Sequence, residues 1–128
     1  MVNVRSSFTG SRGEDEAVEY LKKRGYTITE RNFRTKGGEV DIIARVKDTL
    51  VFVEVKARSS ARYGFPEDAV GPAKRHRIAR AARRYLLLHP VSQNTYIRFD
   101  IIALQYREPS RDEDLRHIQD IDIGEQVH

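Results

Sequence analysis

Apolar and polar positions alternate most clearly in two neighbouring segments, residues 39–45 and 50–57, which are rich in valine, isoleucine and phenylalanine. These residue types favour strands, and Lys47 and Asp48 lie near the turn between the two segments. The pattern therefore predicts a β-hairpin. Three further strands are predicted at residues 26–32, 96–106 and 115–121.

A first helix is predicted over residues 11–24, which carry an apolar stripe that includes Leu21. Ser11 and Glu14 have the spacing of a capping box, in which both side chains bind free amides of the first turn. We therefore expect the helix to begin at Ser11. Gly25 stands where a glycine commonly ends a helix.

A second helix is predicted over residues 73–88, where Ile78, Ala82 and Tyr85 recur at helical spacing. The order of elements is then αβββαβ, with a final β if residues 115–121 form a strand. A strand, a helix and another strand in succession usually pair in parallel, whereas the hairpin is antiparallel. The predicted fold class is α/β, a mixed β-sheet flanked by helices.

The length of 128 residues fits a single domain, residues 1–128, with about 124–128 frayed. Cysteine is absent, which excludes disulfides and thiolate metal sites, and the four histidines have no paired spacing for a metal. No apolar segment reaches the length of a signal peptide's core or of a membrane span. We expect a soluble, cytoplasmic protein that has no membrane partner.

Charge is unevenly distributed, although 23 basic and 19 acidic residues leave a formal charge of only +4. No acidic residue lies between Asp68 and Asp100, whereas the chain after residue 108 is mainly acidic. Segregated charge of this kind suits a nucleic acid on one face of the protein. The candidates for phosphate contacts lie on or near the second predicted helix: Arg58, Lys74, Arg75, Arg77, Arg80 and Arg84. The alternative is that these side chains are simply solvated.

The predicted hairpin carries acidic residues within its apolar segments. Because side chains alternate along a strand, Glu54 and Lys56 share one face, and Glu39 and Asp41 share a face of the preceding strand. A turn centred on residues 47–48 places Asp41 opposite Glu54. At about 5 Å and an effective dielectric constant near 20, two carboxylates repel by roughly 3 kcal/mol.

The repulsion between these carboxylates has to be offset. Lys56 balances one charge, and a divalent cation balances both; oxygen ligands favour Mg²⁺ or Mn²⁺. The alternative is an ordinary hairpin, in which Glu54 and Lys56 form a weak surface pair. The residues alone leave both interpretations open.

Asp41 followed by Glu54-Val55-Lys56 resembles the PD-(D/E)XK signature of the restriction-endonuclease-like superfamily. Nearly the whole chain resembles the bacterial YraN-like family of uncharacterised proteins, which is similar to archaeal Holliday junction resolvases. The matching positions are Gly10-Ser-Arg-Gly13-Glu14, Ala17, Tyr20-Leu21, Gly25-Tyr26, Arg31-Asn32, Gly38 to Ala44, Phe52 to Arg58, Lys74 and Arg98-Phe-Asp100. Two departures are Val40, where the signature has proline, and residues 121–128, which lack the family's Ala-Phe ending.

The resemblance implies a restriction-endonuclease-like fold and Mg²⁺-dependent hydrolysis of phosphodiester bonds in DNA, selective for branched or junction structures. It implies that Asp41, Glu54 and the Val55 carbonyl bind the metal, and that Lys56 acts on the attacking water or the transition state. Glu14 becomes an outer acid that binds the metal directly or through water. Glu39 becomes either an acid that supports the metal ligands without binding the metal, or a residue whose hydrogen bonds shape the loop. Related resolvases imply a homodimer. The alternative is a non-catalytic nucleic-acid-binding protein that retains the fold.

Overall fold

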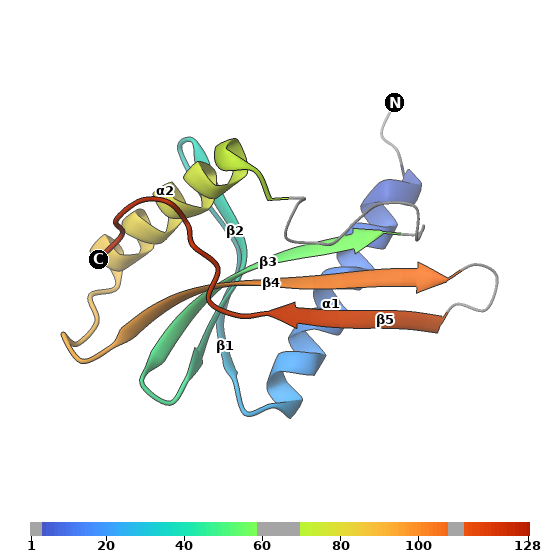
Figure 1. Cartoon of the computed structure of the whole chain (residues 1–128), viewed down its shortest axis with the longest axis horizontal. Helices are drawn as coiled ribbons and strands as arrows, with labels where there is room; N and C mark the ends of the chain where they lie inside the picture. The colour runs from blue at the N-terminus through green and yellow to red at the C-terminus, as the bar shows by residue number, and fades with distance from the viewer. Residues whose placement is uncertain (1–3, 59–69, 108–111) are drawn as a thin grey trace.

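The computed structural model describes residues 4–58, 70–107 and 112–128, where five strands form one sheet in the order β1-β2-β3-β4-β5 (Figure 1). β3 and β4 are parallel, and the other neighbours are antiparallel. The elements are α1 (Val4–Lys23), β1 (Thr27–Thr35), β2 (Gly38–Val46), β3 (Thr49–Arg58), α2 (Pro72–Leu88), β4 (Tyr96–Arg107) and β5 (Asp112–Ile118). The predicted α/β class and mixed sheet are confirmed, with the final strand present.

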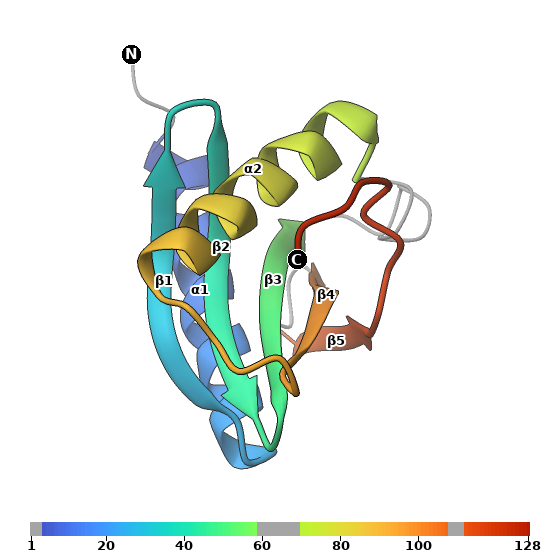
Figure 2. The ribbon, with the colours of Figure 1, turned by 90° about the vertical axis from the view of Figure 1, so that its left-hand side faces the viewer.

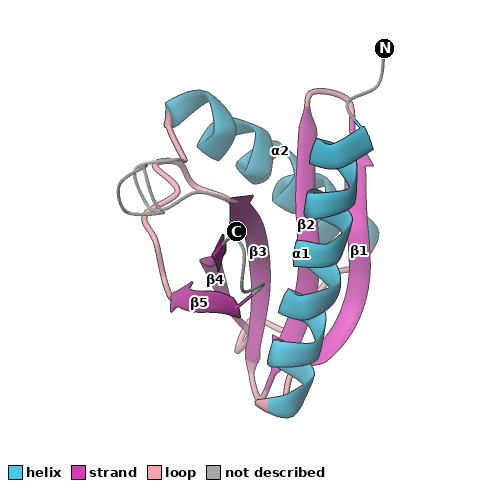
Figure 3. Cartoon of the chain, turned by 90° about the vertical axis from the view of Figure 1, so that its right-hand side faces the viewer, coloured by secondary structure: helices cyan, strands magenta, loops and turns pink. Residues whose placement is uncertain are grey.

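The two helices lie on opposite faces of the sheet, as Figure 2 and Figure 3 show from opposite sides. Phe52 packs with Ile78 and Tyr85 on the α2 side, whereas Val51 packs with Leu21 on the α1 side. The alternation predicted for β3 is therefore confirmed. Neither helix, over its described residues, is long and apolar enough to cross a membrane.

α1 begins at Val4 and not at Ser11, so the predicted start of this helix is wrong. Ser11 lies inside the helix and therefore does not cap its first turn. The prediction failed because the spacing of a capping box also occurs by chance within helices. Glu14 is consequently not a capping partner. The predicted end is confirmed: Gly25 has a φ of +90°, and the Tyr26 amide donates to the Leu21 carbonyl over 3.0 Å.

The hairpin of β2 and β3 turns at Lys47 and Asp48, as predicted, with Lys47 at a φ of +51°. Its register runs from Val46 opposite Thr49 to Ile42 opposite Val53, which is the register that the sequence predicted. Strict alternation fails in β2 beyond Ile42, because Val40 and Ile43 both join the core on the α2 side. The last backbone pair of β2 and β3, Ile42 and Val53, directly adjoins Asp41 and Glu54 in the chain.

α2 packs directly on the beginning of β2. A Cβ atom at Gly38 would lie 2.8 Å from both the Arg77 carbonyl oxygen and the Ala81 amide nitrogen, so only glycine permits this approach. α2 starts with Pro72 in its first turn and ends at Leu88, close to the predicted 73–88. This packing brings Lys74, in the first turns of α2, to Glu39 of β2.

The chain after β5 lies against α2 (Figure 1). β5 begins and ends a few residues earlier than the predicted 115–121. Fraying is expected for residues 124–128, but the structure pairs Glu125 with Arg83 at 2.7 Å and with His76 at 2.9 Å. Ile123 is buried in the core on the α2 side. The acidic end of the chain therefore neutralises part of the basic charge of α2.

Candidate functional site

The candidate site lies at the end of the β2–β3 ladder. Beyond the last pair, Ile42 and Val53, the Val55 amide donates a hydrogen bond of 2.8 Å to Asp41 Oδ2. The side chains of Asp41 and Glu54 are hydrogen-bonded to each other. The two carboxyl groups therefore meet, as the sequence predicted, but Asp41 and Glu54 do not form the directly opposed backbone pair that was expected, because the described ladder ends at Ile42 and Val53.

Glu54 is a buried carboxyl group without adequate partners. Only 3% of the residue is exposed, and its Oε2 atom is buried with no hydrogen-bond partner among the described residues. Burial first, and then Asp41, raise the pKa of Glu54 to about 8, while the charges of Lys74 and Lys56 oppose this rise. A buried carboxyl oxygen that accepts no hydrogen bond and lies beside a second carboxyl group is a costly arrangement, which a cation would relieve.

Glu39 gathers basic side chains at the edge of the acidic pair. Its Oε1 accepts a hydrogen bond of 3.0 Å from Lys74 Nζ, and Arg77 Nη2 lies 3.5 Å from the same atom. Arg34 Nε lies 3.8 Å from Glu39 Oε2. The hydrogen bond from Lys74, assisted by the two arginines, lowers the pKa of Glu39. Glu39 therefore lies beside the site as an ionised, well-paired carboxylate.

Glu14 approaches the same region from α1. Burial first, and then the charge of Asp41, raise the pKa of Glu14, whereas Arg31 and a hydrogen bond with Asn32 lower it. Asn32 adopts a φ of +52° in β1. Glu14 is thus an acid held close enough to Asp41 for the two charges to interact.

The residues fit a magnesium-like cation that keeps several water or substrate ligands. Within residues 4–58, 70–107 and 112–128, no three His, Cys, Asp or Glu side chains are grouped so that they could hold a metal ion. Mg²⁺, however, is usually bound through one or two carboxylates together with water and phosphate oxygens. Asp41 and Glu54 would supply the two carboxylates of such a site, and Glu54 Oε2, which accepts no hydrogen bond from the described residues, would be one ligand atom.

The basic residues predicted to contact phosphate fall into separate groups. Arg77, Arg80 and Arg84 of α2 are exposed, and Arg80 Nε donates over 3.3 Å to the Lys36 carbonyl. Arg75 instead donates to the carbonyl oxygens of Val70, at 2.9 Å, and Asp122, at 2.7 Å. Its guanidinium therefore anchors neighbouring backbone.

Two other predicted basic residues lie nearer the acidic pair. Lys74 points to Glu39 and to Glu54, at 3.0 Å and 3.5 Å, and is half-buried. Arg58 is half-buried at the end of β3, the strand that carries Glu54. Lys56, two residues after Glu54 on the same strand, is also half-buried.

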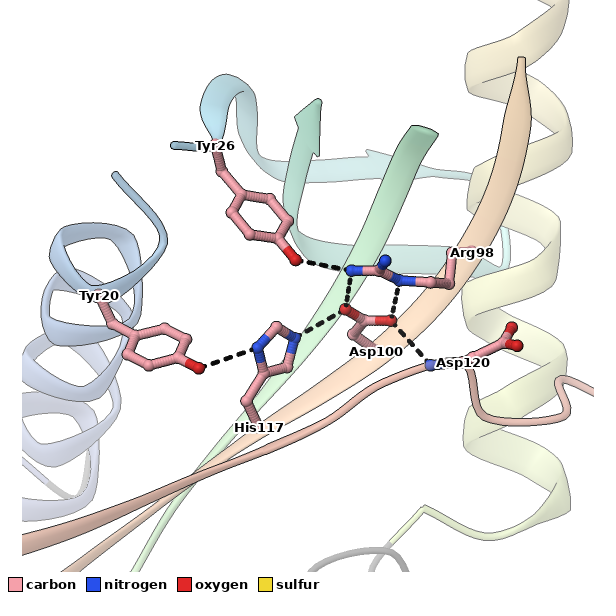
Figure 4. Close-up of polar contacts among 6 residues, drawn as sticks. All are labelled: Tyr20, Tyr26, Arg98, Asp100, His117 and Asp120. Atoms are coloured by element: carbon pink, nitrogen blue, oxygen red, sulfur yellow. Dashed lines mark hydrogen bonds and ion pairs between the residues drawn. The ribbon is translucent and has the colours of Figure 1, made fainter. Parts of the chain in front are cut away.

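A second buried carboxylate, Asp100, was not predicted from the sequence (Figure 4). Arg98 binds both of its oxygens, at 2.9 Å and 2.8 Å, and His117 Nε2 lies 2.7 Å from Oδ2. The Asp120 amide donates to Oδ1 over 3.0 Å, and Tyr20 extends the network to α1 through His117 Nδ1 at 3.1 Å. The sequence did offer one sign of this network: Arg98 and Asp100 are two residues apart on a strand, so their side chains share a face and can form an ion pair.

Asp100 shows what a satisfied buried carboxylate looks like in this protein. Burial acts to raise the pKa of Asp100, but hydrogen bonds from His117, Arg98 and the Asp120 amide outweigh burial and lower it. Glu54 lacks such partners, and its pKa moves in the opposite direction. The contrast indicates a structural role for Asp100, and it identifies Glu54 as the buried carboxyl group whose burial the surrounding residues do not offset.

Comparison with known proteins identifies close relatives. The model of Uncharacterised protein family UPF0102 matches residues 13–104, a range that contains every carboxyl group of the candidate site. A UPF0102 protein of Alkaliphilus oremlandii is 47% identical over 100 residues, covering 77% of this chain and 86% of that protein. A UPF0102 protein of Persephonella marina is 46% identical over 95 residues, covering 74% of this chain and 81% of that protein.

Proposed function

The chain belongs to the YraN-like family of uncharacterised proteins, UPF0102, and from its acidic pair we propose that it is a Mg²⁺- or Mn²⁺-dependent endonuclease that hydrolyses phosphodiester bonds in DNA. One observation carries the proposal. Glu54 Oε2 is buried without a hydrogen-bond partner among the described residues, although Asp41 is hydrogen-bonded to the same side chain. A pair of this kind has no evident use in a purely structural hairpin, because directly opposed acids destabilise sheets.

In this proposal Asp41, Glu54 and the Val55 carbonyl hold the cation. When bound, the cation neutralises charge on the scissile phosphate and lowers the pKa of the attacking water. The Val55 amide fixes the orientation of the Asp41 carboxylate through its 2.8 Å hydrogen bond. Glu14 contributes further negative charge near Asp41, which favours a divalent over a monovalent cation.

Lys56 is the residue that acts directly on the reaction. As an ammonium it orients the attacking water or stabilises the negative charge that develops on the phosphate, or as a neutral amine it accepts a proton from that water. The water oxygen forms a new bond to phosphorus, one phosphorus–oxygen ester bond breaks, and the departing oxygen takes up a proton. No serine or cysteine nucleophile is required.

The exposed face of α2 supports nucleic acid as the partner. Arg77, Arg80 and Arg84 are exposed on the helix whose first turns also carry Lys74 to the acidic pair. A duplex that follows this face would have its backbone close to Glu54. The resemblance to restriction-endonuclease-like enzymes and to archaeal junction resolvases supports branched DNA as the substrate and a homodimer as the active form.

Cleavage of junction, flapped and single-stranded DNA in Mg²⁺, Mn²⁺ or EDTA tests the proposal. We expect wild-type activity only with a divalent cation, and loss of activity in Asp41→Asn and Lys56→Met. Asp41→Asn is chosen because the amide oxygen still accepts the Val55 hydrogen bond. Asp48→Asn, in the exposed turn of the same hairpin, is the matched control and should retain activity.

Two results would count against the nuclease. Cleavage that survives in Asp41→Asn and Lys56→Met would arise from a contaminant. Salt-dependent DNA binding without cleavage under any of these conditions would favour the alternative, a nucleic-acid-binding protein that retains the fold.

A further inference from the structure

Lys74 occupies an unusual position between carboxylates of two strands. Its Nζ atom lies 3.0 Å from Glu39 Oε1 on β2 and 3.5 Å from Glu54 Oε2 on β3. Its side chain is 23% exposed, so the ammonium is partly withdrawn from water. The charge of Asp41 also acts on this ammonium. Lys74 therefore forms an ion pair with the Glu54 oxygen that accepts no hydrogen bond from the described residues.

The two carboxylates bind Lys74 unequally. Glu39 accepts a hydrogen bond from Lys74, whereas Glu54 Oε2 makes only a longer ion pair and has no hydrogen-bond partner in the described structure. Glu39 is also the partner of Arg77, at 3.5 Å. The long Lys74 side chain can thus move away from Glu54 while its ammonium keeps the hydrogen bond to Glu39.

We infer that Lys74 is a built-in counter-ion of Glu54 that Glu39 draws away when a divalent cation binds, so that Glu39 and Lys74 together set the cation affinity of the site. The inference rests on the metal site of the proposed function. A divalent cation at Glu54 and the Lys74 ammonium repel each other at short range. Lys74 competes with the cation for Glu54, whereas Glu39 favours the cation by holding Lys74 elsewhere. Substitutions of these two neighbours therefore have opposite effects.

Mn²⁺ binding to the full chain, measured by calorimetry and by the loss of the free-ion electron spin resonance signal, tests the inference without any cleavage assay. At pH 8.5 we expect Lys74→Met to bind Mn²⁺ about tenfold more tightly, as removal of one nearby unit charge predicts. Glu39→Gln should bind several-fold more weakly, because Lys74 then remains at Glu54. Lys74→Arg, which keeps the charge, should stay close to wild type.

Two control variants match the charge changes away from the site. Lys36→Met removes one exposed positive charge, and Asp48→Asn removes one exposed negative charge. Both should bind Mn²⁺ with wild-type affinity. If Lys74→Met does not fold, as judged by circular dichroism, Lys74→Gln replaces it with a polar side chain of similar reach.

Weaker or unchanged Mn²⁺ binding by Lys74→Met or Lys74→Gln, relative to Lys36→Met, would overturn the counter-ion role. Tighter binding by Glu39→Gln would overturn it as well. Absence of Mn²⁺ binding in the wild type and also in Lys74→Met and Lys74→Gln would refute the metal site and with it the proposed nuclease. If the variants bind Mn²⁺ with the expected affinities but the wild type cleaves no DNA, the counter-ion role of Lys74 stands and the proposed nuclease function is refuted.

Discussion

Replacement of Glu54 by glutamine gives the sharpest test of the acidic pair. Glutamine has nearly the shape of a protonated glutamate and carries no charge, so it keeps the packing and removes the ionisation. Glu54 is 3% exposed, and its pKa in the folded protein is raised from 4.5 to about 8. In the unfolded chain this carboxyl group ionises freely, whereas in the folded protein it retains its proton until the pH approaches about 8.

The sign of the pH dependence follows from these values. A raised pKa means that the folded state binds a proton more tightly than the unfolded state, so the stabilisation is fully present below pH 4.5 and is lost as the pH rises to about 8. At about 1.4 kcal/mol per pH unit, the difference between 4.5 and about 8 sets an upper limit of about 5 kcal/mol. We expect Glu54→Gln to lack this loss.

Urea denaturation between pH 5 and pH 8.5 in EDTA measures the effect. The free energy of unfolding of the wild type should fall relative to that of Glu54→Gln by about 4 kcal/mol over this interval. Other titrating groups largely cancel in this difference, because the two proteins share them. At pH 8, added Mg²⁺ should stabilise the wild type and leave Glu54→Gln unchanged. Glu19→Gln, an exposed position on α1, is the control.

Parallel pH profiles for the wild type and Glu54→Gln would refute the reasoning, since they would mean that Glu54 ionises equally in the folded and unfolded states. Equal stabilisation of both proteins by Mg²⁺ would show that the cation binds elsewhere.

The remaining predictions concern the surroundings of the site. Asp100→Ala should lower the free energy of unfolding by about 3–5 kcal/mol, because Arg98 loses its buried partner; unchanged Mn²⁺ affinity in the folded variant would confirm that the Asp100 network is structural. Gly38→Ala should lower the free energy of unfolding by about 1–3 kcal/mol, measured in thermal melts, because its Cβ would lie 2.8 Å from the α2 backbone. An unchanged stability would mean that α2 can shift to accommodate the added methyl group. Arg84→Ala should reduce the slope of log DNA affinity against log salt by about 0.9, measured by fluorescence anisotropy, and an unchanged slope would remove Arg84 from the interface.

Local signals in the sequence determined the elements and part of the site. The β-branched segments and the turn at Lys47 and Asp48 determined the hairpin and its register, because both depend on residues close in the chain. That register predicted the approach of Asp41 to Glu54. Helical spacing likewise predicted α2 with its buried Ile78. Periodicity did not locate the start of α1, since the capping-box spacing at Ser11 also fits a helix interior.

Tertiary packing decided which charged residues meet. Lys74 was assigned to phosphate contacts from its basic neighbours, but the approach of α2 to Gly38 places it against Glu39, 35 residues away in the chain. The Asp100 network likewise joins His117 to Tyr20 across 97 residues. Periodic patterns report which face of an element is apolar, and they carry no information on which polar residues of distant elements come into contact. Only the packed structure therefore distinguishes the satisfied carboxylate of Asp100 from the unsatisfied one of Glu54.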